Sequence, residues 1–183
     1  MLQVTWAWLG QGPALDLADT VAIVDGAERD LIAAPGDYDR WARLEAAFLP
    51  EGSYRLLRGC RAEVLALRDT VRAVIGAIAD GGSPPRRAVA ELNRASRAAP
   101  AWFELDPEAL TLQGRSSGRA LDRLLAHYAR SAIDLVAGHR PNLRRCPAPS
   151  CGMFYVRTRA AQRWCSTQCG TRARVARHYR RSR

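Results

Sequence analysis

Four cysteines near the end of the chain have the residue type and the spacing of a metal site. Cys146, Cys151, Cys165 and Cys169 form two close pairs, with four residues inside the first pair, three inside the second and thirteen between the pairs. Thiolates are soft ligands that zinc accepts readily, and four of them complete its tetrahedral shell and leave no open position for catalysis. Reduced core cysteines or redox thiols are the alternatives, but two spaced pairs favour metal. We therefore predict one structural zinc ion held by these four side chains, whereas Cys60 stands alone and is expected to be a small core residue.

The residues around these cysteines predict the elements that would position them. The prolines and the glycine within 147–152 favour a tight knuckle, and 153–156 and 162–164 have the composition of the two strands of a hairpin. Ser166 can cap a helix that begins at Cys165, which would place the last two ligands one helical turn apart. Because a helix N-terminus favours negative charge, it helps to keep these sulfurs as thiolates. A knuckle, a hairpin and a helix in this order predict a treble-clef-like zinc finger.

Charge is distributed unevenly along the chain and separates its last part from the rest. The formal net charge is +10, and all 28 basic residues are Arg because the sequence contains no Lys. Residues 1–140 hold 17 of these Arg and all 18 acidic residues, whereas residues 141–183 hold 11 Arg and no acid. Such a segment repels itself unless it meets a polyanion. We therefore expect two units, 1–140 and 141–183, of which the second binds an anionic partner.

An Arg-rich face on the last helix would suit nucleic acid. If that helix extends through Arg181, the helical repeat places Arg174, Arg177, His178 and Arg181 on one face. Guanidinium groups bind phosphate oxygens and the acceptor edge of guanine through paired hydrogen bonds. Aromatic side chains for stacking are few, so double-stranded DNA is favoured over RNA. The residues predicted to contact nucleic acid are Arg157, Arg159, Arg163, Arg172, Arg174, Arg177, His178 and Arg181.

Other interpretations of this basic segment stay open. A charged helix is often only a solvated face, although here no nearby acid compensates the charge. In a protein-interaction module, the zinc unit would dock a protein and the arginines would meet acidic side chains. An RNA-binding accessory protein would use the same charges on structured RNA.

The first 140 residues predict a mainly helical domain with a small antiparallel β element, so the expected fold class is α+β with a C-terminal zinc finger. Apolar residues at helical spacing, together with turn residues, indicate where the elements begin and end. The expected elements are a helical start at Pro13, a strand over 21–24, a helix over 38–49 with Asp37 as its N-cap, a long helix over 53–79, a helix from Pro84 to about Ala98, a hairpin of 101–105 with 109–113, and a helix over 118–137 with Gly138 as its C-cap.

This first domain offers no catalytic arrangement. The three histidines of the chain are scattered and lack a carboxylate or cysteine partner, so we expect no enzyme. Asp16 and Asp19 could share a helix face near Arg40 and line a small-ligand pocket, although a capped or ion-paired helix end is the more common role of such carboxylates. The N-terminus has no basic start and the chain has no apolar run of membrane-spanning length, so we expect a cytoplasmic protein without a membrane contact.

The sequence also resembles two bacterial families. Residues 145–152 (RCPAPSCG), 163–172 (RWCSTQCGTR) and 174–178 (RVARH) resemble the CGNR zinc finger. Residues 14–20 (ALDLADT) and 37–41 (DYDRW) resemble the ABATE domain that usually precedes this finger. The resemblance covers nearly the whole chain and implies a stress-responsive transcription regulator, in which a treble-clef DNA-binding finger follows an α/β domain.

Two features depart from the family pattern. The motif that names the finger reads Cys169-Gly170-Thr171-Arg172, so Thr stands in the place of Asn. The last cysteine pair is also one residue tighter than in many members. Thiolates one helical turn apart still share a face, so we expect zinc ligation to persist, whereas a contact made by the Asn side chain does not carry over.

These observations predict a DNA-binding regulator associated with the nucleoid. Its N-terminal domain would sense a small-molecule effector or dimerise. Because one finger alone should bind weakly, we expect a homodimer that presents two fingers to paired half-sites.

Overall fold

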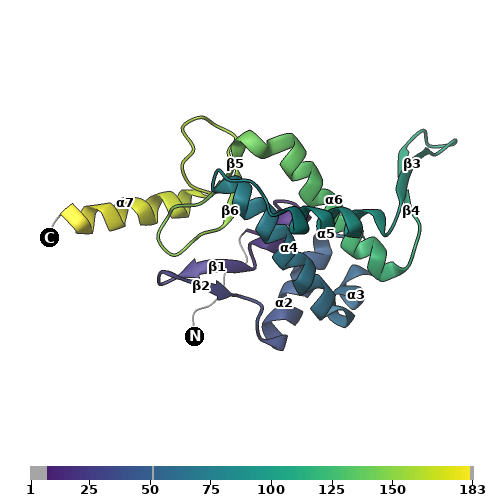
Figure 1. The fold of residues 1–183 in the computed structure, drawn as a ribbon, viewed down its shortest axis with the longest axis horizontal. Coiled ribbons are helices and arrows are strands. Elements are labelled where there is room, and N and C mark those ends of the chain that lie inside the picture. Colours follow the sequence, from purple (N-terminus) through teal and green to yellow (C-terminus); the bar gives the residue numbers. More distant parts are fainter. Residues whose placement is uncertain (1–7, 51, 182–183) are drawn as a thin grey trace.

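The computed structural model describes residues 8–50 and 52–181, which form a mainly helical body with three separate two-stranded antiparallel sheets (Figure 1). The fold class is α+β, as predicted. In chain order the elements are α1 (Pro13–Ala18), β1 (Val21–Val24), β2 (Ala27–Asp30), α2 (Pro35–Glu45), the 3-10 turn η1 (Ala46–Phe48), α3 (Ser53–Gly59), α4 (Arg61–Ala79), α5 (Arg86–Arg97), β3 (Ala101–Leu105), β4 (Leu112–Ser116), α6 (Ala120–His139), η2 (Arg140–Asn142), β5 (Leu143–Arg145), β6 (Phe154–Val156) and α7 (Thr167–Arg181).

The main core lies among α1, α4, α5 and α6, which pack against one another. The apolar positions predicted on the inner side of residues 53–79 are buried, with Leu57, Val64 and Val71 fully so. Trp41 and Tyr128 are the largest side chains that this core encloses completely. Each fully buried leucine or valine contributes about 1.5–3 kcal/mol to folding through its removal from water.

The long helix predicted over 53–79 is divided at Cys60. Helix α3 ends at Gly59 and α4 begins at Arg61, because Cys60 has φ −126° and ψ 41°, outside the helical region. Glycine has low helix propensity, and the Cys60 thiol donates to the carbonyl of Leu56 at 2.7 Å. The expectation that Cys60 is a buried core residue is confirmed.

Other predicted boundaries were also wrong. Helix α2 begins at Pro35 rather than after Asp37, since proline suits the first helical position, where its missing N–H has no partner to lose. Helix α6 continues through Gly138 to His139, so this glycine is no C-cap. Strand β4 starts three residues later than predicted, at Leu112, because the carboxylate of Asp106 accepts two backbone N–H groups and holds the residues before Leu112 in a loop.

A β-hairpin that was not predicted joins β1 to β2. Asp25 and Gly26 form its two-residue turn with φ 52° and 83°, the left-handed values that such a turn needs. The predicted strand over 21–24 therefore has a partner, Ala27–Asp30, and this ribbon reaches the C-terminal part of the chain, as described below.

A carboxylic acid lies inside the core. Glu45 is fully buried, the hydroxyl of Tyr128 donates to its Oε1 at 3.0 Å, and its Oε2 has no hydrogen-bond partner among the described residues. Burial raises the pKa of Glu45 to about 8, and the nearby carboxylate of Asp16 adds to the rise. The folded chain therefore holds a proton on Glu45 at neutral pH.

Stability should fall as the pH rises from 6 to 8. Unfolded Glu45 is already ionised in this range, so the folded state holds one more proton, and raising the pH through the folded pKa removes a contribution of about 2 kcal/mol. Glu45→Gln cannot ionise and should lose this part of the pH dependence. Urea unfolding of both proteins at pH 6 and pH 8 gives the change in the free energy of unfolding of each. Subtracting one change from the other cancels the contributions of all other titrating groups. An equal pH dependence in the two proteins would contradict the assignment.

Candidate metal centre and nucleic-acid interface

The sulfur atoms of Cys146, Cys151, Cys165 and Cys169 all lie within 4.8 Å of one another. Sγ of Cys165 is 3.7 Å from that of Cys151 and 3.5 Å from that of Cys169. A tetrahedron with zinc–sulfur bonds of about 2.3 Å has edges of about 3.8 Å, so these separations fit a zinc ion. When bound, the metal would cross-link the knuckle to α7, and a shell of four protein ligands makes its role structural.

The first two ligands lie in a knuckle between β5 and β6. These strands pair antiparallel, with Leu143 opposite Val156, and the backbone N–H of Cys146 donates to the carbonyl of Met153 at 2.8 Å. The return strand predicted over 162–164 was wrong, because Gln162 holds that segment in a loop by accepting from the N–H of Thr158 and donating to the carbonyl of Trp164. The partner strand precedes the knuckle instead of following it. The treble-clef plan in its details stays a prediction.

The last two ligands flank the start of α7. The helix begins at Thr167, two residues later than predicted, so Cys165 precedes it and Cys169 lies in its first turn. Ser166 Oγ accepts the N–H of Cys169 at 3.2 Å, which is the capping contact that the sequence predicted. The N–H of Cys165 in turn points to the Cys146 sulfur at 3.5 Å. Hydrogen bonds from the Cys151 and Cys165 thiols and from backbone amides lower the pKa of Cys146, whereas the contacts with Cys146 raise the pKa of Cys151 and of Cys165.

Arg172 supports the same cluster from within α7. Its Nη2 donates to the Cys169 sulfur at 2.9 Å, and its Nη1 donates to the carbonyl of Ser150 in the knuckle at 3.2 Å. Partial burial opposes the charge on this guanidinium, but the bond to the Cys169 sulfur and the electrostatic attraction of the cysteine cluster together outweigh it and raise the pKa of Arg172. The structure therefore gives Arg172 a position at the metal centre, although the sequence had assigned it to the nucleic-acid surface.

The finger packs against the helical body through Phe154. This fully buried ring lies in the main core, between the guanidinium of Arg145 at 4.6 Å and that of Arg72 at 5.7 Å from its centroid. The backbone N–H of Phe154 donates to Oδ1 of Asp19 at 2.8 Å, and Arg145 pairs with both carboxylate oxygens of Asp80 at 3.0 Å. The hairpin of the finger is thus part of the core of the preceding domain.

The knuckle also touches the first hairpin. The N–H of Ile23 in β1 donates to the carbonyl of Cys151 at 2.8 Å. Gly152 has φ +69°, and a Cβ at this position would lie 2.3 Å from Cγ1 of Ile23. Glycine is required here both by the backbone conformation and by the close approach of β1.

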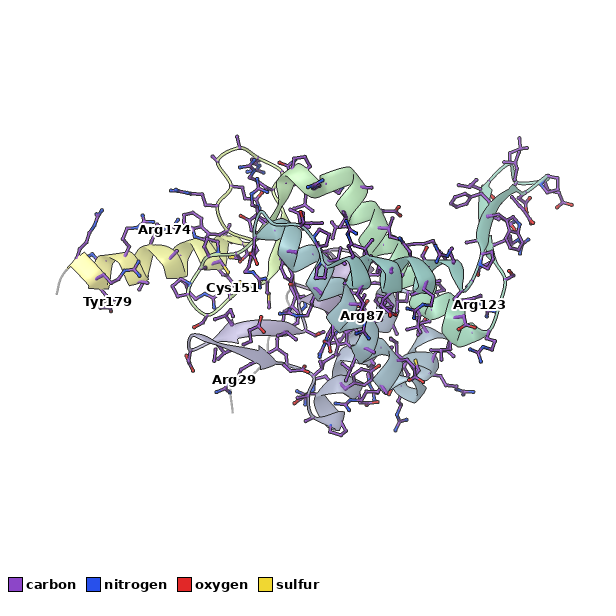
Figure 2. The ribbon with its side chains drawn as sticks, in the orientation of Figure 1. Arg29, Arg87, Arg123, Cys151, Arg174 and Tyr179 are labelled. Atoms are coloured by element: carbon purple, nitrogen blue, oxygen red, sulfur yellow. The ribbon has the colours of Figure 1, made fainter. Side chains whose placement is uncertain are left out.

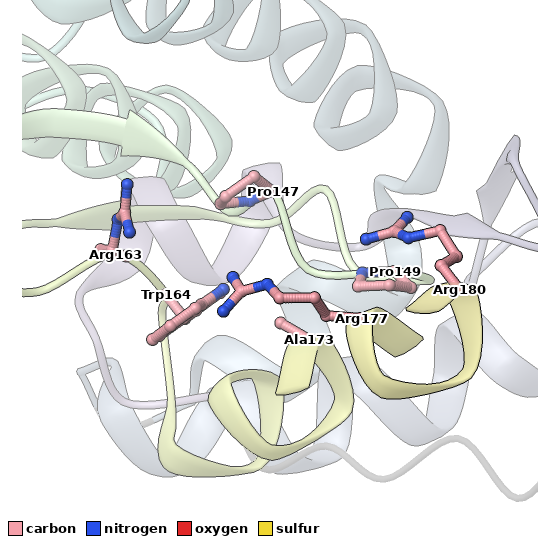
Figure 3. Close-up of a pocket in the computed structure, with 7 residues that line it drawn as sticks. All are labelled: Pro147, Pro149, Arg163, Trp164, Ala173, Arg177 and Arg180. Carbon is pink, nitrogen blue, oxygen red and sulfur yellow. The ribbon is translucent and has the colours of Figure 1, made fainter. Parts of the chain in front are cut away.

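Helix α7 leads away from the body and carries exposed arginines (Figures 1 and 2). Along the side of α7, Arg163, Arg177 and Arg180 line a pocket of about 260 Å³ that Pro147 and Trp164 also line. Figure 3 shows the Arg177 side chain extending toward the Trp164 ring. A second hollow, of about 520 Å³, is also lined by Trp164, together with Arg159, Arg163 and Arg174. We call these five arginines and Trp164 the Arg–Trp surface; its members are Arg159, Arg163, Trp164, Arg174, Arg177 and Arg180.

Other predicted contact residues have different surroundings. Nη2 of Arg157 lies 3.5 Å from Oδ1 of Asn142 at the end of the β5–β6 hairpin. The ring of His178 packs edge-on against that of Tyr179, and Arg181 is exposed at the end of α7. Arg180 and Trp164 were absent from the predicted contacts, although the spacing of Ala173, Arg177 and Arg180 along a helix could have indicated that Arg180 shares their face.

Comparison with known families accounts for both parts of the chain. The model of the ABATE family, whose description is "Putative stress-induced transcription regulator", matches residues 11–139, more than half of the chain. The chain belongs to the ABATE family. The CGNR zinc finger matches residues 142–182. No curated protein matches the sequence. With its four converging cysteines, this finger binds one structural zinc ion.

The name-giving motif of the CGNR finger has a clear local role in this chain. A Cβ at Gly170 would lie 3.3 Å from Cε3 of Trp164, so glycine lets the indole pack on the first turn of α7. Thr171, which replaces Asn, donates to the carbonyl of Thr167 at 3.2 Å and accepts from Nη2 of Arg174 at 3.0 Å. Thr171 therefore orients one guanidinium of the Arg–Trp surface.

In the ABATE domain, the three residues suggested for a ligand pocket have separate partners. Asp16 is buried and accepts three successive backbone N–H groups from the loop before α1. Asp19 binds the finger, and its burial raises its pKa more than the bond from Phe154 lowers it. Arg40 lies on the exposed side of α2, 4.0 Å from Asp37. Within the part of the chain that the structure describes, no helix has the length and apolar character needed to span a membrane.

Arg172→Ala should weaken zinc binding about 10–100-fold, because groups that hydrogen-bond a metal ligand orient it and stabilise its charged form. Competition with a chromophoric chelator measures the affinity. Arg174→Ala is the matched control, since it removes the same charge from the same helix without touching a sulfur. Equal zinc affinities for the two variants would show that the contact between Arg172 and Cys169 has no influence on the metal.

Proposed function

We propose that the protein is a transcription regulator whose CGNR finger binds double-stranded DNA through the Arg–Trp surface. One observation carries the proposal: arginines from the loop before α7 and from α7 itself converge around the indole of Trp164, in a segment without any acidic residue. Arg145 pairs with Asp80 at the end of α4, and residues 141–183 contain no acidic residue of their own, so the positive charge of this segment is largely uncompensated. Such a surface attracts phosphates strongly.

The form of the surface favours a duplex over a single strand. Helix α7 projects from the body, as a helix that enters a major groove must (Figure 1). Trp164 is half-buried and packs on Gly170, so only part of its ring is accessible for base stacking. The guanidinium groups of Arg163 and Arg177 can reach phosphates from the loop and from the helix at once, and this would fix the orientation of the finger.

We assign the ABATE domain a regulatory role that acts through its junction with the finger. Asp19 and Phe154 join the two parts inside one core, so a change in the domain would move the base of the finger. The four-cysteine site is closed, which supports a binding role rather than catalysis. Zinc thiolates need a reducing compartment, so we place the protein in the cytoplasm, on the nucleoid.

Two double variants with the same change in net charge test this function. Arg177→Ala with Arg180→Ala removes two groups of the Arg–Trp surface, whereas Arg87→Ala with Arg97→Ala removes two exposed arginines from α5. At 100 mM salt, fluorescence anisotropy with a labelled duplex should show affinity at least about 30-fold weaker for the first variant. The second should bind like the unaltered protein, and both should keep one zinc per chain.

Equal losses in the two variants would show that only net charge matters and would refute the proposed surface. Preferential displacement by structured RNA would indicate the RNA-binding alternative. If the unaltered protein with its zinc bound no nucleic acid even at low salt, the finger would be a protein-docking module.

A further inference from the structure

The β3–β4 hairpin extends from the helical body at the end opposite to α7 (Figure 1). Every residue of β3 is exposed, and in β4 every residue except Gln113 is exposed. A two-stranded ribbon is marginally stable at best in water when neither face is covered. This hairpin therefore needs a further contact on one of its faces.

Pairing in the hairpin separates a polar face from an apolar one. Trp102, Glu104 and Arg115 share the first face, where Glu104 accepts from the Trp102 indole at 2.8 Å and from the Arg115 guanidinium at 3.0 Å. Those polar groups satisfy one another. This face needs no partner.

The opposite face contains no charged side chain. Phe103, Leu105 and Leu112 lie on it at 74%, 64% and 70% exposure, beside Gly114, and Leu110 in the adjoining loop is 72% exposed. These four apolar side chains are among the most exposed large hydrophobic residues in the described chain. A contiguous apolar face of this kind marks a contact site.

We propose that this face is the contact through which two copies of the chain form a dimer. The face is uncharged and can meet its own copy around a two-fold axis without juxtaposing like charges. From ordinary side-chain areas, each copy offers roughly 500 Å², so the pair would bury roughly 1,000 Å², the lower bound of a specific interface. A partner recognised by charge would find no ion-pairing group on this face.

The position of the hairpin fits this assignment. Because it lies at the end of the molecule opposite to α7, pairing two hairpins leaves both Arg–Trp surfaces exposed (Figure 1). The dimer would thus present two fingers. The inference does not depend on DNA binding, and its test contains no DNA.

Light scattering of the unaltered protein at about 50 µM should give twice the chain mass of 20.2 kDa. At this concentration a dimer with a dissociation constant of about 1 µM is almost fully formed. Leu112→Asp buries a charge in the contact and should weaken the dimer at least about 100-fold, so that it runs at the mass of one chain. Leu44→Asp makes the same substitution at another exposed leucine, in α2, and should remain a dimer. Zinc content and helical circular dichroism verify that each variant is folded.

A monomeric unaltered protein at this concentration would overturn the proposal. A dimer that persists in Leu112→Asp would also overturn it, because the contact would then lie on another surface. Concentration-dependent species larger than two chains would contradict a closed two-fold contact.

Discussion

Replacing Cys165 with serine is expected to abolish zinc binding and unfold the finger beyond β6. Binding of a structural zinc ion supplies about 10–16 kcal/mol at neutral pH, and small modules of this kind do not fold without it. The core of the finger is little more than the four cysteines, Ala148, Tyr155 and the partly buried Met153 and Trp164, which cannot replace that energy. Elemental analysis should give one zinc per chain for the unaltered protein and none for Cys165→Ser. Hydrogen exchange should show loss of amide protection across α7 and retention across α4 and α6.

Cys60→Ser provides the matched control for this experiment. It makes the same chemical change at a buried core cysteine whose thiol donates to a helical carbonyl and lies outside the metal cluster. It should retain one zinc and full protection of α7. Stoichiometric zinc in Cys165→Ser, or loss of zinc from Cys60→Ser, would contradict the assigned ligand set.

Phe154→Ala should destabilise the whole protein and not the finger alone. Truncating a fully buried phenylalanine costs about 3–5 kcal/mol, and here it also removes the ring that Arg72 and Arg145 flank. For a chain of this length, the loss corresponds to a decrease in Tm of roughly 6–20 °C. Differential scanning calorimetry should show one transition for the unaltered protein, because the hairpin of the finger and the ABATE domain share a core.

Phe48→Ala serves as the comparison, since that ring is 52% exposed. The free energy of unfolding should fall by less than about 1.5 kcal/mol in Phe48→Ala, because the side chain buries a smaller area than that of Phe154. A Phe154→Ala protein whose main transition is unchanged would show that the ABATE domain folds independently of the finger, against the shared core described above.

The metal ligands and the fold class could be predicted from the sequence because they depend on local rules. Cysteine type and spacing indicate a zinc site without knowledge of the surrounding fold, and helical periodicity identified the buried side of residues 53–79. The Asp25-Gly26 turn also had a local signal, a two-residue turn sequence next to a β-branched strand, but the hairpin was missed.

The position of the finger could not be predicted in this way. Strand β5 is only Leu143, Arg144 and Arg145, which by composition belongs to the basic linker, and it becomes a strand because Leu143 and Phe154 are buried in the core of the other domain. The bond between Asp19 and Phe154 joins residues 135 positions apart. A local rule assigns Asp19 to a helix end, and only tertiary packing gives it a partner in β6.

The different roles of two arginines in α7 also depend on tertiary packing and could not be predicted from the sequence. The sequence listed Arg172 and Arg174 together as candidate DNA contacts; the helical repeat places Arg174 on the face with Arg177, but it names no partner for Arg172. In the structure one guanidinium binds a zinc-ligating sulfur and the other rests on Thr171 beside Trp164. The difference arises because Arg172 faces the knuckle and Arg174 faces the loop over residues 158–164.

The most direct test of the account is the salt dependence of duplex-DNA binding by the zinc-loaded protein. If the five arginines of the Arg–Trp surface each neutralise one phosphate, log affinity should fall against log salt with a slope of about −4.5 per finger. A slope in this range, lost on treatment with a chelator, is the predicted result. Absence of binding at 50 mM salt, or an affinity that salt does not change, would contradict the claim that this surface contacts DNA.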